Sequence, residues 1–264
     1  MTDRAALVTG GSSGMGKAMA RVLGQEGYAL TICGRDRAKL DGAVEELRGE
    51  GFEAQGVAGD VTQEAAVVEV LGAHLGAYGR LDVVANTAGG TGGAGGGPLA
   101  TMAVETVDRA MAANIRSVFL LIHHSLEALL AAGAEHGKAL FVNIGSAAGK
   151  EGTPGLSQYS AAKAGVRMLT EAAQAENRNR GVQFTTLIPG FVDTPPATWA
   201  VAMGVGHEEM LAPEDLGEAV RFLLRTSPRC IVREIELMPP DQPGFLARLN
   251  AARRERAAAA SGPA

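Results

Sequence analysis

The sequence predicts an α/β domain in which about seven parallel strands form one doubly wound sheet with helices on both faces. Short apolar runs alternate with longer segments of helical periodicity from residue 5 to residue 237. Strands buried on both faces are apolar along their whole length, and parallel neighbours need crossover helices between them. Because no linker rich in proline or serine divides this alternation, we expect residues 1–244 to form a single domain.

The individual elements follow from the alternation. The expected strands are short and rich in aliphatic side chains, and they cover residues 5–9, 29–33, 52–58, 81–85, 139–144, 182–188 and 230–237. The expected helices lie between them and cover residues 16–26, 37–48, 63–78, 104–132, 157–180 and 214–224. Residues 245–264 hold an arginine cluster and a run of alanines, and we expect a tail that is first partly helical and then disordered.

The composition excludes several classes of protein and partner. The chain has 264 residues, of which 46% are hydrophobic and 20% charged, which is enough to bury a sizeable core. Its formal net charge of -5 argues against nucleic acid or an anionic membrane as a partner. Cys33 and Cys230 lie too far apart to indicate a disulfide framework or a zinc site, and the adjacent His123 and His124 lack a third ligand. No apolar run approaches the roughly 18 residues of a membrane span and no signal peptide precedes the first strand, so we expect a cytoplasmic protein without a resident metal.

A glycine-rich turn follows the first expected strand and opens the first helix. Glycines let the backbone turn tightly and approach a ligand closely, and the free amides at a helix N-terminus attract an anion. Between a strand and a helix, such a turn predicts a dinucleotide-binding site, with a flexible surface turn as the alternative. The expected cofactor-binding residues of this turn are Thr9, Gly10, Ser12, Ser13, Gly14, Met15 and Gly16.

The end of the second strand bears on the choice of dinucleotide. An acidic residue there would bind the ribose 2′-hydroxyl of NAD(H), whereas a basic residue accommodates the 2′-phosphate of NADP(H). Arg35 follows Gly34, and a guanidinium pairs well with phosphate. We therefore expect NADP(H) to be preferred and NAD(H) to be possible, because Asp36 could compete for the ribose. Further cofactor-binding candidates, at the ends of the third and fourth strands, are Asp60, Val61, Asn86, Ala88 and Gly89. Asp60 could instead cap the helix that follows it.

The strongest chemical signal lies in the helix expected over residues 157–180. Tyr159 and Lys163 are four residues apart and therefore face the same side of that helix, one turn apart. We expect the lysine ammonium to lower the pKa of the phenol, so that the tyrosine can exchange a proton with a carbonyl or alcohol oxygen. Ser146 follows the fifth strand, and its hydroxyl can hydrogen-bond the same oxygen. A lone Tyr-Lys pair at this spacing is usually solvated, but its combination with the serine and the glycine-rich turn indicates a catalytic site.

In order along the chain, these motifs resemble those of the short-chain dehydrogenase/reductase family, in its compact form with a Rossmann-like fold. The resemblance covers about residues 5–237 and rests on Thr9-Gly10-x-x-x-Gly14-x-Gly16, Asp60, Asn86-x-Ala88-Gly89, Asn114, Ser146, Tyr159-x-x-x-Lys163 and Pro189-Gly190. It implies that Tyr159 is the general acid/base, that Lys163 lowers the pKa of the phenol and binds the nicotinamide ribose, and that Ser146 orients the substrate oxygen. It further implies that Asn114 holds a water in a proton relay to Lys163. The residues implied to line the nicotinamide are Pro189, Gly190, Val192 and Thr194.

The chain departs from the family pattern at three places. Thr87 stands where the family has asparagine, residues 89–97 contain seven glycines, and Asp-Gly-Gly is missing after the last strand. The glycine-dense segment is either a mobile loop at the mouth of the site or a flexible surface insertion. The resemblance also implies a lid over the substrate at residues 195–210, which carries Trp199 and two methionines, so we expect an apolar substrate. The alternative is that these residues pack against the body of the domain.

The resemblance implies an oxidoreductase that transfers a hydride between NADP(H) and a small-molecule carbonyl or alcohol, such as a ketone or aldehyde reductase. The alternatives are an NAD-dependent alcohol dehydrogenase and a regulator of the same fold that binds nucleotide without turnover. A nucleotide-sugar epimerase is disfavoured, because the spacing of the glycines differs and no large substrate domain follows. Helices 104–132 and 157–180 resemble the pair that forms the family's dimer interface, so we expect a homodimer or homotetramer.

Overall fold

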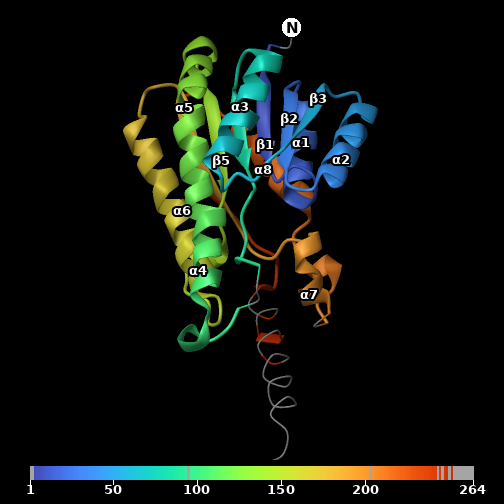
Figure 1. The fold of residues 1–264 in the computed structure, drawn as a ribbon, viewed down its shortest axis with the longest axis vertical. Helices are drawn as coiled ribbons and strands as arrows, with labels where there is room; N and C mark the ends of the chain where they lie inside the picture. The colour runs from blue at the N-terminus through green and yellow to red at the C-terminus, as the bar shows by residue number, and fades with distance from the viewer. Residues whose placement is uncertain are drawn as a thin grey trace, which may run out of the picture.

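The computed structural model describes residues 3–93, 96–202, 204–242, 244, 247–248 and 251; the predicted tail, residues 245–264, lies outside this set apart from 247–248 and 251. One sheet of seven parallel strands has the order β3-β2-β1-β4-β5-β6-β7 (Figure 1), which confirms the predicted fold class. The strands are β1 (Ala5–Thr9), β2 (Ala29–Gly34), β3 (Ala54–Ala58), β4 (Val83–Asn86), β5 (Ala139–Ile144), β6 (Val182–Pro189) and β7 (Glu234–Leu237). The order turns back between β1 and β4, and open α/β sheets bind ligands at the carboxyl ends of their strands at such a point.

Helices cover both faces of the sheet. They are α1 (Gly14–Gln25), α2 (Arg37–Gly49), α3 (Glu64–Tyr78), α4 (Val104–Met111), α5 (Ser117–His136), α6 (Ser157–Glu176), α7 (Thr198–Val201) and α8 (Pro213–Arg225). Helices α1, α2 and α8 pack on one face, and α3, α5 and α6 pack on the other (Figure 1). Successive strand side chains point to opposite faces, so Ala6 and Val8 of β1 join the apolar cluster under α1, whereas Leu7 joins the cluster under α3. This alternation explains why the strands are apolar throughout.

The helix expected over residues 104–132 is continuous but irregular. Helix α4 passes into a π-helical turn, Ala112–Arg116, and then into α5, which ends only at His136. Such turns are rare and occur frequently at functional sites. By length and hydropathy the stretch Val104–His136 could cross a membrane, but core helices meet the same criteria, and 44% of its most apolar window is buried inside the fold.

Most other predicted boundaries differ from the observed ones by one or two residues, but two are wrong by four residues. The last strand begins at Glu234 rather than at residue 230; just before it, the Thr185 hydroxyl donates to the carbonyl of Val232 at 2.6 Å and Thr186 N donates to Arg233 O at 3.0 Å. The helix expected to reach residue 180 ends at Glu176, because Asn179 has a left-handed backbone (φ 60°) that a right-handed helix cannot include.

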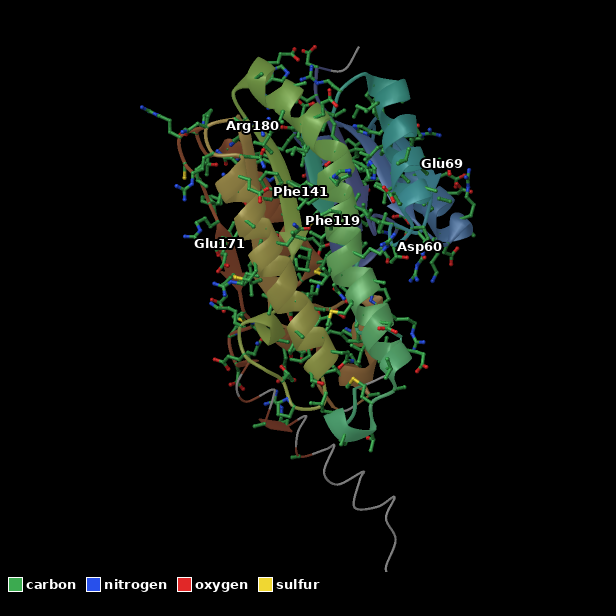
Figure 2. The ribbon with its side chains drawn as sticks, turned by 60° about the vertical axis from the view of Figure 1, so that its left-hand side comes forward. Asp60, Glu69, Phe119, Phe141, Glu171 and Arg180 are labelled. Carbon is green, nitrogen blue, oxygen red and sulfur yellow. The ribbon has the colours of Figure 1, made fainter. Side chains whose placement is uncertain are left out.

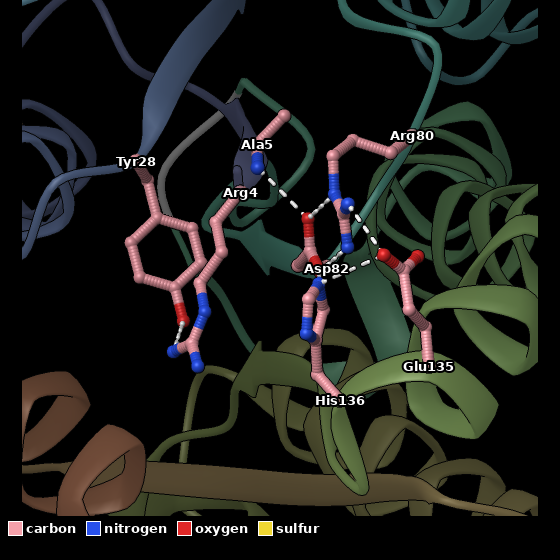
Figure 3. A network of polar contacts seen from close by, with 7 residues as sticks. All are labelled: Arg4, Ala5, Tyr28, Arg80, Asp82, Glu135 and His136. Carbon is pink, nitrogen blue, oxygen red and sulfur yellow. Dashed lines mark hydrogen bonds and ion pairs between the residues drawn. The ribbon is translucent and has the colours of Figure 1, made fainter. Parts of the chain in front are cut away.

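A buried carboxylate fastens the amino edge of the sheet. Asp82, just before β4, accepts a hydrogen bond from the backbone N–H of Ala5 at 2.8 Å. Its two oxygens also accept hydrogen bonds from Arg80 at 2.7 and 2.8 Å (Figure 3). His136, at the end of α5, lies 3.9 Å from the same carboxylate. This network joins β1, β4 and α5 at the edge opposite the carboxyl ends of the strands, where the candidate site lies.

Candidate active site

The glycine-rich turn after β1 forms a cradle that side chains would fill. Gly10 and Gly14 have left-handed backbone angles (φ 65° and 50°), which favour glycine. A Cβ atom on Gly16 would lie 2.2 Å from the carbonyl oxygen of Gly10, so this close approach requires glycine. Ser13, at the N-cap of α1, makes no side-chain capping hydrogen bond and leaves the first amides of the helix to a ligand. The cradle therefore fits a pyrophosphate group.

Backbone hydrogen bonds bring the loops after β1, β2 and β3 together. Gly11 N donates to Cys33 O, and Gly59 N donates to Gly34 O, both at 3.1 Å. Ser12 lies beside the end of β2, since a Cβ atom on Gly34 would meet its hydroxyl oxygen at 3.2 Å. The predicted pyrophosphate and ribose ends of the site are therefore neighbours. Among the predicted residues of the turn, Met15 packs against the apolar core.

Asp36 and Arg35, which follow β2, differ in whether other residues of the chain bind their charged groups. Asp36 caps α2: its Oδ1 accepts a hydrogen bond from Lys39 N at 3.1 Å, and its Oδ2 lies 3.7 Å from Lys39 Nζ. Arg37 pairs with Asp41 at 3.0 Å. Arg35 is exposed, and within the described part of the chain no hydrogen bond or ion pair engages its guanidinium. The arrangement leaves Arg35 available to an anion and ties Asp36 to the helix.

Asp60 forms the turn between β3 and α3. Its Oδ1 accepts a hydrogen bond from Thr62 N at 3.0 Å, and its carbonyl accepts one from Gln63 N at 2.8 Å. This is an Asx turn ahead of α3, whose N-cap is Gln63 without a side-chain capping hydrogen bond, so the interpretation of Asp60 as the cap of α3 is wrong. Val61 is buried beside Cys33 in the cluster under α3. A contact of either residue with a dinucleotide stays a prediction.

A chain of buried polar side chains runs beneath the site. Thr9 Oγ1 donates to Asn86 Oδ1 at 2.6 Å, and Asn86 Nδ2 donates to Asn143 Oδ1 at 2.9 Å. Asn143 Nδ2 donates in turn to Thr170 Oγ1 of α6 at 2.9 Å. Satisfied buried networks of this kind rigidify a fold, and this one aligns the ends of β1, β4 and β5 with α6. Asn143 and Thr170 were not predicted, although an asparagine within an apolar strand was a usable signal.

The segment after β4 lies against both the cradle and the predicted catalytic residues. Thr87 Oγ1 donates to Thr9 O at 2.7 Å, so the residue that departs from the family pattern still ties β4 to β1. A Cβ atom on Gly89 would lie 2.7 Å from Asn114 Oδ1 and 3.1 Å from Lys163 Nζ. Gly89 therefore separates these two polar groups at a spacing that only glycine permits.

Asn114 lies within the π-helical turn and is fully buried. Its Nδ2 donates to Gly90 O at 2.7 Å and to Ala110 O at 2.8 Å, while its Oδ1 accepts from Gly90 N at 3.4 Å. The carboxamide thus attaches the segment after β4 to the long helix. Its predicted role in holding a water stays a prediction.

Ser146, Tyr159 and Lys163 meet at the carboxyl end of β5, as predicted. The Ser146 hydroxyl hydrogen-bonds with the Tyr159 phenol and also accepts from Ala148 N at 3.2 Å. Lys163 is buried, and its Nζ donates to Ile144 O at 2.8 Å. The same nitrogen lies 5.7 Å from the centroid of the Tyr159 ring.

The direction of the pKa shift at Tyr159 corrects one expectation. Burial raises the pKa of the phenol above its ordinary value, and the hydrogen bond with Ser146 offsets only part of this shift. Burial also lowers the pKa of Lys163 to about 8. The predicted lowering of the phenol's pKa is therefore wrong for the protein by itself, because desolvation outweighs the hydrogen bond with Ser146.

The residues after β6 approach the cradle from another side. A Cβ atom on Gly14 would lie 3.0 Å from the methyl group of Thr194, so these two predicted residues are neighbours. Val192 is buried and forms an isolated bridge with Leu211. Gly190 N donates to a carbonyl of β7 at 2.8 Å. The structure thus places the predicted nicotinamide segment beside the glycine cradle, while its contacts with nicotinamide stay predictions.

The predicted lid, residues 195–210, packs largely on itself. Its buried apolar side chains, with Phe191 beside them, are Ala197, Ala200, Val205 and Met210. His207 Nδ1 lies 2.8 Å from Asp193 Oδ2, which ties the lid to the loop after β6. Met203 and the side chain of Trp199 lie outside the described residues.

The adjacent histidines of α5 have other contacts. The ring of His123 stacks on Phe119 with centroids 5.8 Å apart, and His124 Nε2 lies 3.0 Å from Glu64 Oε1. Within the described ranges, no three histidine, cysteine or acidic side chains are grouped so that they could hold a metal ion.

Comparison with known protein families and sequences identifies relatives of this chain. The family of short chain dehydrogenases matches residues 4–202. A component of the granaticin polyketide synthase of Streptomyces violaceoruber, provisionally assigned as ketoacyl reductase 1, is 38% identical over 192 residues, which are 73% of this chain and 69% of that protein. A Streptomyces coelicolor protein, provisionally assigned as a ketoacyl reductase, is 34% identical over 237 residues, covering 83% of this chain and 89% of its own.

Solved structures show the same architecture. A variant of the actinorhodin polyketide ketoreductase with NADPH has a TM-score of 0.81 and 30% identity, covering 90% of this chain and 97% of its own. An alcohol dehydrogenase of the archaeon Thermococcus sibiricus, complexed with 5-hydroxy-NADP, has a TM-score of 0.77 and 30% identity, covering 89% and 95%. A 3-ketoacyl-(acyl-carrier-protein) reductase of Brucella melitensis, complexed with NADH, has a TM-score of 0.79 and 26% identity, covering 91% and 98%. The family match and these relatives agree with the cradle and the Ser-Tyr-Lys group. The chain therefore belongs to the short-chain dehydrogenase family.

Proposed function

We propose that the chain is an NADP(H)-dependent oxidoreductase that interconverts a ketone or aldehyde and the corresponding alcohol. The observation that carries this proposal is the meeting of Ser146, Tyr159 and Lys163 at the carboxyl edge of the sheet, beside a cradle that fits a pyrophosphate. The family supports the oxidoreductase class, and the NADPH and 5-hydroxy-NADP of two similar structures support the cofactor.

Each residue of the candidate site has a distinct role in the proposed carbonyl reduction. The cofactor, when bound, supplies the hydride, with its pyrophosphate on the cradle and its 2′-phosphate at Arg35. Ser146 donates a hydrogen bond to the carbonyl oxygen and orients it beside the phenol. The raised pKa of Tyr159 keeps the phenol protonated at neutral pH, which is the state that gives a proton to this oxygen. The ammonium of Lys163 stabilises the tyrosinate that remains.

A substitution of Tyr159 tests the assigned acid. Proton transfer by a positioned side chain contributes roughly 10²- to 10⁴-fold, so Tyr159→Phe should lower kcat for ketone reduction by at least about 100-fold. The dissociation constant of NADPH, measured by fluorescence titration, should stay within about two-fold, since the phenol hydroxyl does not build the cradle. Tyr78→Phe is the matched control. The Tyr78 hydroxyl donates to Leu30 O at 2.9 Å and takes no part in the candidate site. Retention of most activity by Tyr159→Phe would refute the role.

Titration with NADPH and NADH tests the cofactor. We expect tighter binding of NADPH, because Arg35 is free to pair with a 2′-phosphate while Asp36 caps α2. Hydrogen bonds to charged groups contribute about 1.5–3 kcal/mol, so Arg35→Asp should weaken NADPH binding by about 10- to 100-fold. Arg37→Asp carries the same change of charge two residues away and should leave the preference intact. A chain that prefers NADH, with or without Arg35, would instead be an NAD-dependent alcohol dehydrogenase.

We also propose an apolar substrate, a homodimer or homotetramer and a cytoplasmic location. The apolar cluster of the lid and the ketoacyl reductase assignments of two relatives support the substrate class.

Phe119 on α5 and Met168 on α6 are 53% and 50% exposed, and Figure 2 shows α5 and α6 side by side with Phe119 on this face. Large exposed apolar side chains on these two helices suit an interface. Light scattering should give a mass of at least two chains, and Phe119→Asp should lower it.

A further inference from the structure

The glycine tract, defined as residues 89–97, is fastened to the site along its described part, residues 89–93 and 96–97. At its start, the carboxamide of Asn114 holds Gly90 by hydrogen bonds in both directions. Next to it, Arg109 Nε donates to Gly92 O at 2.7 Å, and a Cβ atom on Gly92 would lie 2.5 Å from a carbonyl of α4. At its end, Gly97 N donates to Gly155 O at 2.8 Å, just before α6. The described residues of the tract therefore lie beside Lys163 at one end and beside the start of the helix that carries Tyr159 at the other.

Gln158 connects this tract to the catalytic helix. It directly precedes Tyr159, its side chain is 3% exposed, and its Nε2 donates to Thr91 O at 3.2 Å. Its Oε1 is buried without a hydrogen-bond partner among the described residues. Burying a half-satisfied amide costs free energy that an apolar side chain of similar size would avoid, so packing alone does not account for a glutamine here.

We infer that Gln158 is a positioning residue, which holds the glycine tract beside Tyr159 and thereby limits the size of the carbonyl substrate that the site admits. The inference deepens the proposed function and rests on it. Gly89, two residues before Thr91, lies against Lys163 and Asn114, so this part of the tract borders the reacting groups. Glycines resist such displacement poorly because their backbone has many accessible conformations, which makes an external hydrogen bond to the tract valuable.

Hydrogen exchange tests the positioning role without substrate. Loss of one hydrogen bond corresponds to a change of about three- to ten-fold in a local opening equilibrium. Gln158→Leu in the full chain should therefore speed amide exchange in the peptide that covers residues 89–97 by about this factor. Gln174→Leu is the matched control: Gln174 lies on the same helix, is similarly buried, and accepts from Phe184 N at 2.9 Å far from the tract. Equal exchange of the tract in wild type and Gln158→Leu would overturn the inference.

Kinetics with two ketones test the effect on specificity. With cyclohexanone and the bulkier 2-tetralone, Gln158→Leu should reduce the discrimination in kcat/KM by about three- to ten-fold through KM, while the NADPH dissociation constant stays unchanged. Gln158→Glu should lose discrimination in the same way at pH 8, because an ionised carboxylate has no proton to donate to Thr91 O. Unchanged discrimination in both variants would refute the specificity role. A wild-type chain that reduces no ketone would overturn the proposed function and the specificity role with it, whereas the exchange result would still decide the positioning role.

Discussion

His74 makes the stability of the fold depend on pH. It lies in α3 with no exposed surface, and its Nδ1 hydrogen-bonds with Thr31 Oγ1 at 2.8 Å. The ring of Tyr78 packs edge-on against it with centroids 5.3 Å apart. Burial lowers the pKa of the imidazole from 6.5 to about 4, because a charged ring would lose its hydration in this apolar layer.

The size and sign of the effect follow from proton linkage. The unfolded chain binds a proton at His74 below pH 6.5, whereas the folded chain does so only below about pH 4. The free energy of unfolding is therefore insensitive to this residue above pH 7.5 and falls as the pH drops through 6.5. One pKa unit corresponds to about 1.4 kcal/mol, so the loss is about 2 kcal/mol between pH 8 and pH 5 and approaches about 3 kcal/mol below pH 4.

Urea denaturation of wild type and His74→Gln at pH 8 and pH 5 measures this term. Glutamine does not titrate and can still hydrogen-bond the Thr31 hydroxyl. The variant is expected to be less stable than wild type at pH 8 but to lose about 2 kcal/mol less on acidification, since all other titrating groups cancel in the comparison. If both proteins lose the same free energy between the two pH values, His74 is not buried in its neutral form and the reasoning fails.

Two further substitutions probe the candidate site. Gly89→Ala would place a methyl group 2.7 Å from Asn114 Oδ1, so kcat should fall at least about ten-fold while circular dichroism shows the fold retained; wild-type activity would contradict the crowding. Asp36→Ala removes the cap of α2 and should lower the free energy of unfolding by about 1 kcal/mol, measured in urea, without altering the preference between NADPH and NADH. A changed preference would show that Asp36 contacts the ribose after all.

The sheet could be predicted because its determinants are local. Each strand buried on both faces is an apolar run, and each crossover helix shows its own periodicity, so the alternation alone indicates a parallel sheet. The cradle was equally accessible, since Gly10, Gly14 and Gly16 stand between a strand and a helix. Tyr159 and Lys163 share a helix face at a spacing of four residues. These features need only the order of residues along a short stretch.

Other parts of the site depend on contacts between distant segments. The hydrogen bonds of Asn143 with Asn86 and Thr170 span separations of 57 and 27 residues, and although an asparagine in an apolar strand stands out, the local sequence does not identify its partners. The π-helical turn around Asn114 likewise could not be predicted, because the spacing of apolar residues there does not distinguish it from an α-helix. The sequence left open whether Asp36 would contact the ribose or cap α2. The hydrogen bond from Lys39 N to Asp36 Oδ1 in the folded chain shows that it caps the helix.

By itself, the order of residues determined the parallel sheet, the glycine cradle and the pairing of Tyr159 with Lys163 on one helix face. The tertiary structure alone decided the direction of the pKa shifts in that pair and the hydrogen bond from Gln158 to Thr91 of the glycine tract. The physical reason is that a pKa depends on how much water the surrounding chain excludes, and burial comes from all the segments that pack around a group. Charge attraction between two neighbours can be anticipated from their spacing, whereas the desolvation that outweighs it at Tyr159 belongs to the folded molecule as a whole.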